Sequence, residues 1–318
     1  MNILVTGGTG FIGSNLTRAL LAAGHRVSIT GNHNENTIPD GIVKLYVPGL
    51  TGIDWTSLAK EKIDAVFHLA ANNYTQDEDE IGMLKANLDG PSYLFNFLYD
   101  WCGCKKFIFA SSAAVYGSQP TPFVENHTRI EPLTPYGRSK AMFDDFAMKF
   151  AKNRRGVSAV GLRYCNVFGA GESHKQTRSS MIYQIIGAIL SKSKPSLFQG
   201  SYKRDWIYID DVVKANLKAL DWNGVDIFNC AGGISISFEE IVQMVCDHLG
   251  LSVDINWIDN PIKDTYQSIT QCNIDRIKKH LKFQPSDFKT NLIKCIDMIT
   301  GDALNMGHPA CFAPINRQ

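Results

Sequence analysis

Two reactive side chains stand four residues apart in the stretch Pro135-Tyr136-Gly137-Arg138-Ser139-Lys140. This stretch opens an amphipathic pattern that predicts a helix, on which Tyr136 and Lys140 share one face, one turn apart. A phenol has a reference pKa near 10, and a neighbouring ammonium favours the phenolate and lowers that pKa. The spacing therefore suggests a tyrosine that acts as a base beside a lysine. The plain alternative is a surface tyrosine next to a solvated lysine.

Ser112 adds a third polar group to this pair. It follows the apolar segment 105–110, which predicts a strand, and it stands at the carboxyl end of that strand. In open α/β sheets, ligands bind outside the carboxyl ends of the strands. We therefore expect the Ser112 hydroxyl to hydrogen-bond the same substrate oxygen that Tyr136 approaches.

The first residues of the chain predict a dinucleotide site. A short apolar strand, Asn2–Thr6, runs into a G-x-x-G-x-x-G loop, and an apolar-periodic helix follows at about 11–23. Glycines in such a loop let the backbone approach a pyrophosphate, and the helix N-terminus offers unpaired N–H groups and a positive dipole end. A cluster that only makes a tight turn is the alternative, but the strand-then-helix context favours the cofactor. The predicted contacts are Gly7, Gly10, Phe11, Ile12 and Gly13.

The end of the second predicted strand, Arg26–Thr30, bears on the choice between NAD and NADP. An acidic residue there would accept a hydrogen bond from the ribose 2′-hydroxyl. The chain instead continues with Gly31-Asn32-His33, so nothing repels a 2′-phosphate, and Asn32 or His33 could hydrogen-bond it. We therefore expect NADP or NAD as cofactor, with NADP slightly favoured. The alternative is that Gly31 only makes a turn and that no side chain of this segment recognises the adenosine ribose.

Strand and helix patterns alternate six times along the first half of the chain. Further predicted strands lie at 42–47, 63–71 and 157–162. This alternation predicts an α/β fold with a doubly wound parallel Rossmann sheet and right-handed crossovers. We assign residues 1–167 to the dinucleotide-binding domain, with a returning segment near 205–230. Residues 168–318 are expected to form mainly a smaller C-terminal α/β substrate domain.

The fourth predicted strand and the helix after it carry further candidate residues. His68 lies inside the apolar strand and is expected to be a hydrogen-bonded core histidine. The small Ala70 and Ala71 at the strand end leave space for the cofactor ribose, and Asn73 begins a loop that could touch substrate. Asn87 is central on a long helical stretch at about 77–101.

The composition excludes several classes of protein. The 318 residues carry a formal net charge of +1 with no sustained basic run, so no nucleic-acid or polybasic membrane surface is predicted. No apolar run is long enough to span a membrane, and the strand pattern starts at Ile3, so we expect no cleavable leader. The eight cysteines are scattered, which suggests reduced, buried thiols, and no Cys/His cluster predicts a metal. We expect a soluble, cytoplasmic, metal-free protein.

Taken together, the motifs resemble those of the extended short-chain dehydrogenase/reductase superfamily, which holds nucleotide-sugar epimerases and dehydratases. The matching segments are 6–13, 68–71, 111–117, 135–140, 163–169 and 204–212, within a resemblance that runs from Asn2 to about Ile299. It implies that Tyr136 takes the substrate hydroxyl proton as hydride leaves for the nicotinamide. Lys140 would lower the pKa of Tyr136 and hold the nicotinamide ribose, and Ser112 would steady the developing carbonyl oxygen. The implied cofactor contacts further include Leu69, Ala70, Ala71 and Asn87.

Within that superfamily, the chain most resembles the ADP-glyceromanno-heptose 6-epimerases. The similar features are the segments 171–175, 197–205 and 264–271. The resemblance implies that Lys175 is a second acid/base opposite Tyr136, because inverting a carbon by oxidation and re-reduction needs proton transfer for both orientations of the carbonyl. The alternatives for Lys175 are a flexible surface lysine or a partner of the diphosphate.

The same resemblance implies a nucleotide-diphosphate sugar as substrate and bacterial surface-polysaccharide synthesis as the pathway. Arg204 and Tyr266 would contact the diphosphate, and Asn166 and His174 would line the sugar pocket. The predicted substrate contacts are Asn73, Ser112, Asn166, His174, Lys175, Phe198, Arg204 and Tyr266. The chain departs from the heptose enzymes at Gly31, where they have an acidic residue, and at 176–180, where they have smaller ones. Cofactor and sugar therefore stay open.

The first functional hypothesis is a redox-neutral nucleotide-sugar epimerase. The second is another sugar-nucleotide 4-epimerase or a net oxidoreductase of the same superfamily. A 4,6-dehydratase is less expected, because those enzymes have Thr-Asp-Glu where this chain has Ser112-Ala113-Ala114. A non-catalytic dinucleotide-binding module is the remote alternative. Exposed-looking aromatics on the helical stretches 77–101 and 136–153, among them Tyr93, Phe97 and Phe146, suggest a homo-oligomer.

Overall fold

The computed structural model describes residues 1–31, 38–47, 49–74 and 79–305. Its largest feature is a sheet of seven strands in the order β10-β6-β5-β4-β1-β2-β3, and every neighbouring pair is parallel. The strands are β1 (Asn2–Thr6), β2 (Arg26–Thr30), β3 (Lys44–Tyr46), β4 (Ala65–His68), β5 (Lys106–Ser112), β6 (Ser158–Tyr164) and β10 (Val225–Cys230). The predicted doubly wound parallel sheet is confirmed. Strand order reverses between β1 and β4, which is where such sheets bind ligands.

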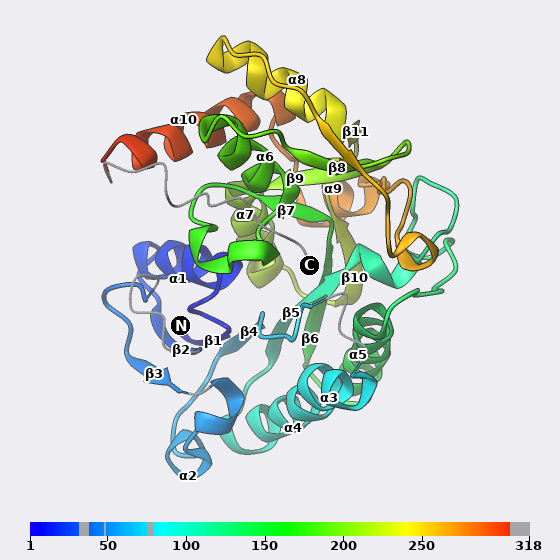
Figure 1. The fold of residues 1–318 in the computed structure, drawn as a ribbon. Helices are drawn as coiled ribbons and strands as arrows, with labels where there is room; N and C mark the ends of the chain where they lie inside the picture. Colours follow the sequence, from blue (N-terminus) through cyan, green and yellow to red (C-terminus); the bar gives the residue numbers. More distant parts are fainter. Residues whose placement is uncertain (32–37, 48, 75–78, 306–318) are drawn as a thin grey trace.

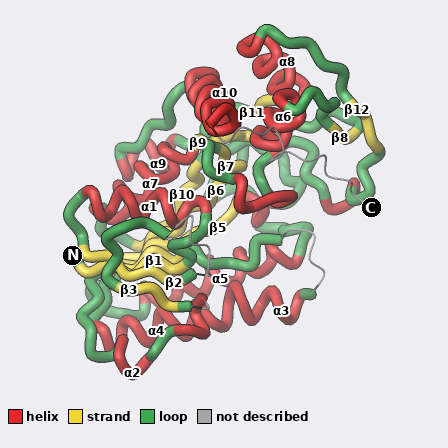
Figure 2. The backbone as a smooth tube through the Cα atoms, turned by 60° about the vertical axis from the view of Figure 1, so that its left-hand side comes forward, coloured by secondary structure: helices red, strands yellow, loops and turns green. Residues whose placement is uncertain are grey.

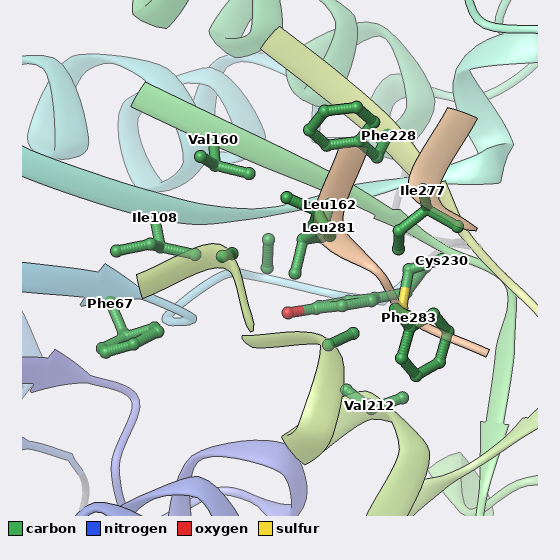
Figure 3. Packing of buried hydrophobic residues seen from close by; sticks show 14 of the residues in the cluster. Phe67, Ile108, Val160, Leu162, Val212, Phe228, Cys230, Ile277, Leu281 and Phe283 are labelled. Carbon is green, nitrogen blue, oxygen red and sulfur yellow. The ribbon is translucent and has the colours of Figure 1, made fainter. Parts of the chain in front are cut away.

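Helices cover both faces of this sheet (Figures 1 and 2). One face packs against α1 (Phe11–Ala22), α7 (Ile209–Asp221) and α9 (Asp275–Leu281), and the other against α4 (Gly90–Cys102) and α5 (Pro135–Lys152). The alternation of side chains along β5 separates the two cores: Ile108 faces the first and Phe107 the second. Figure 3 shows the first core, where Leu162 of β6 lies near Leu281 of α9. A sheet covered on both faces explains the apolar strands seen in the sequence.

Short elements connect these layers. They are η2 (Gly49–Gly52), α2 (Trp55–Leu58), α3 (Glu80–Leu84), the π-helical turn η3 (Lys85–Asp89) and η4 (Ala113–Tyr116). The long helix predicted near 77–101 is therefore divided into α3, η3 and α4. The π-helical turn adds a residue to the helical spacing, and η3 carries the buried Asn87.

A second layer is built around the strands β11-β9-β7 and the pair β12-β8. These strands are β7 (Asn166–Phe168), β8 (Ser196–Phe198), β9 (Lys203–Tyr208), β11 (Ser235–Ser237) and β12 (Asn256–Ile258). A separate apolar core joins them to α6 (Met181–Leu190), α8 (Phe238–Leu249) and α10 (Phe288–Asn305). The turns η5 (Ser173–Arg178) and η6 (Lys263–Thr265) complete this part. Figure 1 shows it above the carboxyl ends of β5 and β6.

The chain passes between the two parts more than once. β9 lies in the three-stranded sheet, after which α7 and β10 return to the large sheet, where β10 pairs with β6. The capping box expected at α8 is present, since Ser237 Oγ accepts from the Glu240 N–H and Glu240 accepts from the Ser237 N–H.

Two expectations from the composition bear on this description. The seven cysteines among the described residues are all free and buried, as expected. In the described part of the chain, no helix combines the length and apolar character that a membrane span requires.

Candidate active site

The start of α5 positions the tyrosine and lysine predicted to act together. Thr134 caps the helix by accepting from the Gly137 N–H at 3.1 Å, and Pro135 occupies its first turn. Tyr136 therefore lies in the first turn and Lys140 one turn later, with Nζ 5.9 Å from the centroid of the Tyr136 ring. Lys140 is 3% exposed, and its Nζ donates to the Ala110 carbonyl of β5 at 3.0 Å. This bond fixes the ammonium at the carboxyl edge of the sheet.

Ser112 reaches the same place from the end of β5. Its hydroxyl lies close enough to the Tyr136 phenol to lower the pKa of that phenol, and its Oγ accepts from the Ala114 N–H at 3.1 Å. The structure thus brings Ser112, Tyr136 and Lys140 together, as their positions in the sequence predicted. A hydroxyl, a phenol and an ammonium that converge on one point can bind an alcohol or carbonyl oxygen and exchange a proton with it.

Burial dominates the acid–base properties of this group. It raises the pKa of Tyr136, whereas the sequence predicted that Lys140 would lower it. The Ser112 hydroxyl opposes this rise, and Asp144 adds to it. Burial also lowers the pKa of Lys140 to about 8, against an opposing effect of the Asp144 carboxylate. Lys140 therefore keeps its charge at neutral pH by a narrow margin.

Asp144 is a residue of this site that the sequence analysis missed. It follows Lys140 by one turn of α5, is 4% exposed, and accepts from Arg163 of β6 through Nε at 3.0 Å and through the second guanidinium nitrogen at 2.9 Å. Arg163 also donates to the Tyr116 hydroxyl at 2.8 Å, and Tyr116 donates to Asn229 Oδ1 at 2.7 Å. The signal that could have found Asp144 is its spacing, which places a carboxylate on the same helix face as Tyr136 and Lys140.

The glycine loop forms a close backbone cradle between β1 and α1. Gly7 has φ +70°, and a Cβ there would lie 2.8 Å from the Ala70 nitrogen. A Cβ at Gly13 would lie 2.0 Å from the Gly7 carbonyl oxygen. Gly10 is the N-cap of α1 and supplies no capping side chain. A tightly packed, uncapped helix start without an acidic first turn suits a dinucleotide pyrophosphate, so these residues fit the implied cofactor.

The other predicted cofactor residues lie around this cradle in different ways. Leu69 and Ala70 are half-buried against Gly7, and Ala71 is exposed. Asn87 is buried: its Oδ1 accepts from the Asn72 N–H at 2.8 Å, and its Nδ2 donates to the Asn72 carbonyl at 2.8 Å and to Ser139 Oγ at 3.0 Å. Its amide is thus used to hold the loop after β4 against α5. Asn32 lies outside the described residues.

His68 is a satisfied core residue, as expected. It is 1% exposed, and its Nδ1 lies 2.8 Å from Thr6 Oγ1. Burial lowers its pKa to about 3, so the ring is neutral at working pH. It fixes β1 to β4 and is not a proton-transfer group.

Lys175 approaches the cofactor side of the molecule from η5. Its Nζ lies 4.9 Å from the centroid of the Phe11 ring at the start of α1. The same Nζ donates to Glu172 Oε2 at 2.6 Å. Glu172 is fully buried and also accepts from the N–H and the hydroxyl of Ser180, at 2.8 and 2.7 Å. Glu172, which the sequence analysis did not single out, therefore fixes the lysine next to the glycine loop.

Asn166 and His174 lie in the part between the two sheets. Asn166 Nδ2 donates to the Asp205 carbonyl at 2.9 Å and to Thr270 Oγ1 at 3.4 Å. His174 is half-buried with Nδ1 3.1 Å from the Gly171 carbonyl, and burial together with the Lys175 charge lowers its pKa. Asn73, by contrast, is exposed on the loop after β4.

Phe198, Arg204 and Tyr266 form one wall with Tyr202, which the sequence analysis missed. The Tyr266 ring lies 5.4 Å from Phe198 and 5.1 Å from Tyr202, both edge-on. The Arg204 guanidinium stands 4.5 Å over Tyr266 and donates to the Lys203 and Ser268 carbonyls at 2.8 and 3.2 Å. Arg204 is only 6% exposed. Some of the Arg204 N–H groups that were predicted to bind a diphosphate therefore bind backbone carbonyls of this wall instead.

The fold and this geometry define a class of protein. A doubly wound parallel sheet with a glycine cradle at its switch point, and a serine, a tyrosine and a lysine at its carboxyl edge, suits an enzyme that works with a bound dinucleotide. A family model described as the NAD dependent epimerase/dehydratase family matches residues 3–231. The chain belongs to this family.

Solved structures agree with this membership. The chain is similar to a UDP-N-acetylglucosamine 4-epimerase from Methanobrevibacter ruminantium, with 26% identity, TM-score 0.86, and coverage of 95% of this chain and 98% of the other. It is similar to the Helicobacter pylori ADP-L-glycero-D-manno-heptose-6-epimerase, with 27% identity, TM-score 0.82, and 95% of each chain covered. A UDP-glucose 4-epimerase from Thermotoga maritima matches with 25% identity, TM-score 0.84, and coverage of 95% and 99%. The heptose epimerases suggested by the sequence are thus among the similar structures.

Proposed function

We propose that this protein is a nucleotide-sugar epimerase that inverts one carbon by transient oxidation to a keto sugar and re-reduction. The observation that carries the proposal is the convergence of Ser112, Tyr136 and Lys140 at the sheet edge that also holds the glycine cradle. When bound, the dinucleotide would accept a hydride from the carbinol carbon and return it to the other face of the carbonyl. The residues of the chain then have to orient the sugar and move its proton.

Each of the three residues has a separate task in this proposal. Tyr136 removes the hydroxyl proton of the carbinol as the sugar is oxidised. Lys140, fixed by the Ala110 carbonyl, supplies the positive charge that favours the phenolate and reaches the cofactor ribose. Ser112 donates to the carbonyl oxygen as charge develops on it.

Lys175 is proposed as the acid/base for the second orientation of the keto sugar. Its ammonium lies beside Phe11, at the start of the helix that would hold the pyrophosphate. The 2.6 Å bond to Glu172 holds its Nζ next to the glycine loop, where the ammonium can donate to a carbonyl oxygen. A partner of the diphosphate is the alternative role, and it predicts an effect on KM without one on kcat.

The proposed cofactor is NAD or NADP, and the family description favours NAD. NADP stays a proposal that rests on the absence of a carboxylate at 31–33. The proposed substrate is a nucleotide-diphosphate sugar. It would contact Asn73, Asn166, His174 and the wall of Phe198, Arg204 and Tyr266. A nucleotide-activated heptose is supported by the likeness to the Helicobacter pylori enzyme, and a UDP-sugar is the second candidate, supported by the two 4-epimerases.

The test is turnover without added cofactor. Purified protein is incubated with ADP-heptose, UDP-glucose and UDP-N-acetylglucosamine, and the epimer ratio is followed by NMR. Inversion of one of them without added dinucleotide supports the proposal. Conversion only when stoichiometric NAD or NADP is consumed indicates a net oxidoreductase. The protein could instead bind a sugar nucleotide and a dinucleotide tightly but convert no candidate, including further nucleotide sugars. That result would contradict the epimerase and support a non-catalytic dinucleotide-binding module.

We also infer that the protein forms a homodimer through α4 and α5. A groove of about 690 Å³ runs between these helices, with Leu88, Met142 and Phe146 among its lining residues and Asp145 and Lys149 at its side. Tyr93 and Trp101 of α4 are 56% and 67% exposed. Asp145 and Lys149 pair with each other at 2.6 Å, so the side of the groove carries no net charge that would oppose an isologous contact between two copies of this face. Met142→Glu should give a monomer in sedimentation, whereas Ile234→Glu, 48% exposed on another surface, should not.

A further inference from the structure

Two buried thiols face each other at the junction of the two sheets. Cys165 lies between β6 and β7, and Cys272 lies 107 residues later in the chain, with their Sγ atoms 3.1 Å apart. They are 7% and 2% exposed. The proposed reaction uses neither thiol.

Backbone contacts hold both thiols in place. The Cys165 N–H donates to the Cys230 carbonyl at the end of β10 at 3.1 Å. The Cys272 N–H donates to Asp205 Oδ2 at 2.9 Å, and the backbone at Cys272 forms an isolated β-bridge with the backbone at Phe123. The approach of the two sulfurs is therefore fixed by the fold and not by the rotation of one free side chain.

A metal ion is the first alternative for this place, because Asp205 could join the two sulfurs as a ligand. Both of its oxygens are already used, however. Oδ1 accepts from the N–H groups of Gly232 and Gly233 at 2.8 and 3.0 Å, and Oδ2 accepts from those of Gly233 and Cys272 at 3.1 and 2.9 Å. Coordination would compete with these bonds, which leaves the two sulfurs as the reactive pair.

We propose that Cys165 and Cys272 are a modification site that forms a reversible disulfide when the protein meets a hydroperoxide. The bond would join the end of the large sheet to the segment that packs along β9 of the second sheet. It would also lie next to Asn166 and near Thr270, which already share a hydrogen bond. Reduction by a thiol would restore both cysteines.

The two sulfurs react in turn, and their 3.1 Å contact allows either thiol to react first. The thiolate of one cysteine attacks a peroxide oxygen: an S–O bond forms, the O–O bond breaks, and hydroxide leaves. The thiolate of the other cysteine then attacks this sulfur: the S–S bond forms, the S–O bond breaks, and a second hydroxide leaves. The two thiol protons convert both hydroxides to water, and the two electrons lost by the sulfurs reduce the peroxide.

The test is a peptide map of the full-length protein after treatment with hydrogen peroxide. The sample is quenched with catalase, denatured with N-ethylmaleimide and digested, and the peptides are identified by mass spectrometry. We expect a linked peptide containing Cys165 and Cys272 that dithiothreitol separates. The proposal is overturned if both residues carry maleimide, if either ends as sulfinic acid with the other free, or if Cys165 is joined to Cys230.

Two variants separate this pair from the other buried cysteines. Cys295→Ser removes a fully buried thiol of the second core and should leave the linked peptide unchanged. Cys272→Ser should abolish it. Because the bond closes a loop of 107 residues, peroxide should raise the Tm of the wild type and of Cys295→Ser by about 5 °C. An equal rise in Cys272→Ser would contradict the assignment.

Discussion

The residues proposed for proton transfer and the residues proposed to face the sugar are positioned in two different ways. Tyr136, Lys140 and Asp144 lie on successive turns of α5, and buried contacts to β5 and β6 fix the last two. The sugar-facing residues come from loops and from the second sheet. Asn166, for example, is held by contacts to residues 39 and 104 positions away.

This difference assigns separate tasks to the two regions. Helix geometry brings a phenol, an ammonium and a carboxylate onto one face, so most of the proposed chemistry depends on one local segment, and β5 adds Ser112. The substrate surface depends on many long-range contacts, so its side chains can change without disturbing the proton transfer. Similar structures with different sugar nucleotides fit this division.

The largest effect is expected from Tyr136→Phe in the local region. Removal of the hydroxyl should lower kcat by about 10³-fold, because Lys175 serves the opposite orientation of the sugar and cannot replace Tyr136 as the base. Binding of sugar nucleotide and dinucleotide, measured by calorimetry, should stay within about threefold. Tyr93→Phe, at an exposed position, is the matched control and should keep full activity. Wild-type turnover by Tyr136→Phe would contradict the assigned base.

Lys175→Gln tests whether a residue outside α5 also takes part in proton transfer. If Lys175 is the second acid/base, kcat should fall by about 10²-fold while the KM for the sugar nucleotide changes little. Lys194→Gln removes an exposed lysine paired with Asp254 and should have no effect. A rise in KM at unchanged kcat would instead make Lys175 a diphosphate partner.

The fold and the local region were predictable because their signals are short-range. Strand and helix periods, the glycine loop and the Tyr136–Lys140 spacing are all visible within windows of a few residues. Glu172, Tyr202 and the use of the Asn87 amide were not, because each depends on burial against segments far away in the chain. Asp144 lies between these cases: its spacing was visible, but its partner Arg163 is on a different strand.

Gly13→Ala tests whether the cradle serves the dinucleotide. The added Cβ would meet the Gly7 carbonyl at 2.0 Å, so the loop must move. We expect dinucleotide affinity, measured by fluorescence titration, to fall by about 10–100-fold. Gly90→Ala is the control, since its Cβ meets no atom closer than 3.5 Å. Unchanged affinity in Gly13→Ala would exclude the loop from the cofactor site.

The smallest effect, a pH shift, should come from Asp144→Asn. The Asp144 carboxylate raises the pKa of Lys140, so its loss lowers that pKa from about 8 and the ammonium is lost at lower pH. In a plot of kcat against pH, the alkaline limb should move to lower pH by about one pH unit. His68 has a pKa of about 3 and the Arg163 guanidinium stays charged, so neither adds a limb near neutral pH.

Asp144→Asn also leaves Arg163 buried without its carboxylate, which costs about 3–5 kcal/mol of unfolding free energy. The pH profile separates this loss from the electrostatic role, because lower stability alone does not move the limb. Asp144→Glu should restore the position of the limb. A profile that stays in place in Asp144→Asn would show that the carboxylate acts on stability only.

The central claim is that this chain holds a dinucleotide at its glycine cradle and returns the hydride to the same sugar. The most direct measurement is mass spectrometry of the small molecules released when the purified protein is denatured, quantified against protein and compared with Gly13→Ala. The account predicts about one NAD or NADP per chain from the wild type and much less from the variant. A wild type that releases none and binds neither dinucleotide on titration would contradict it.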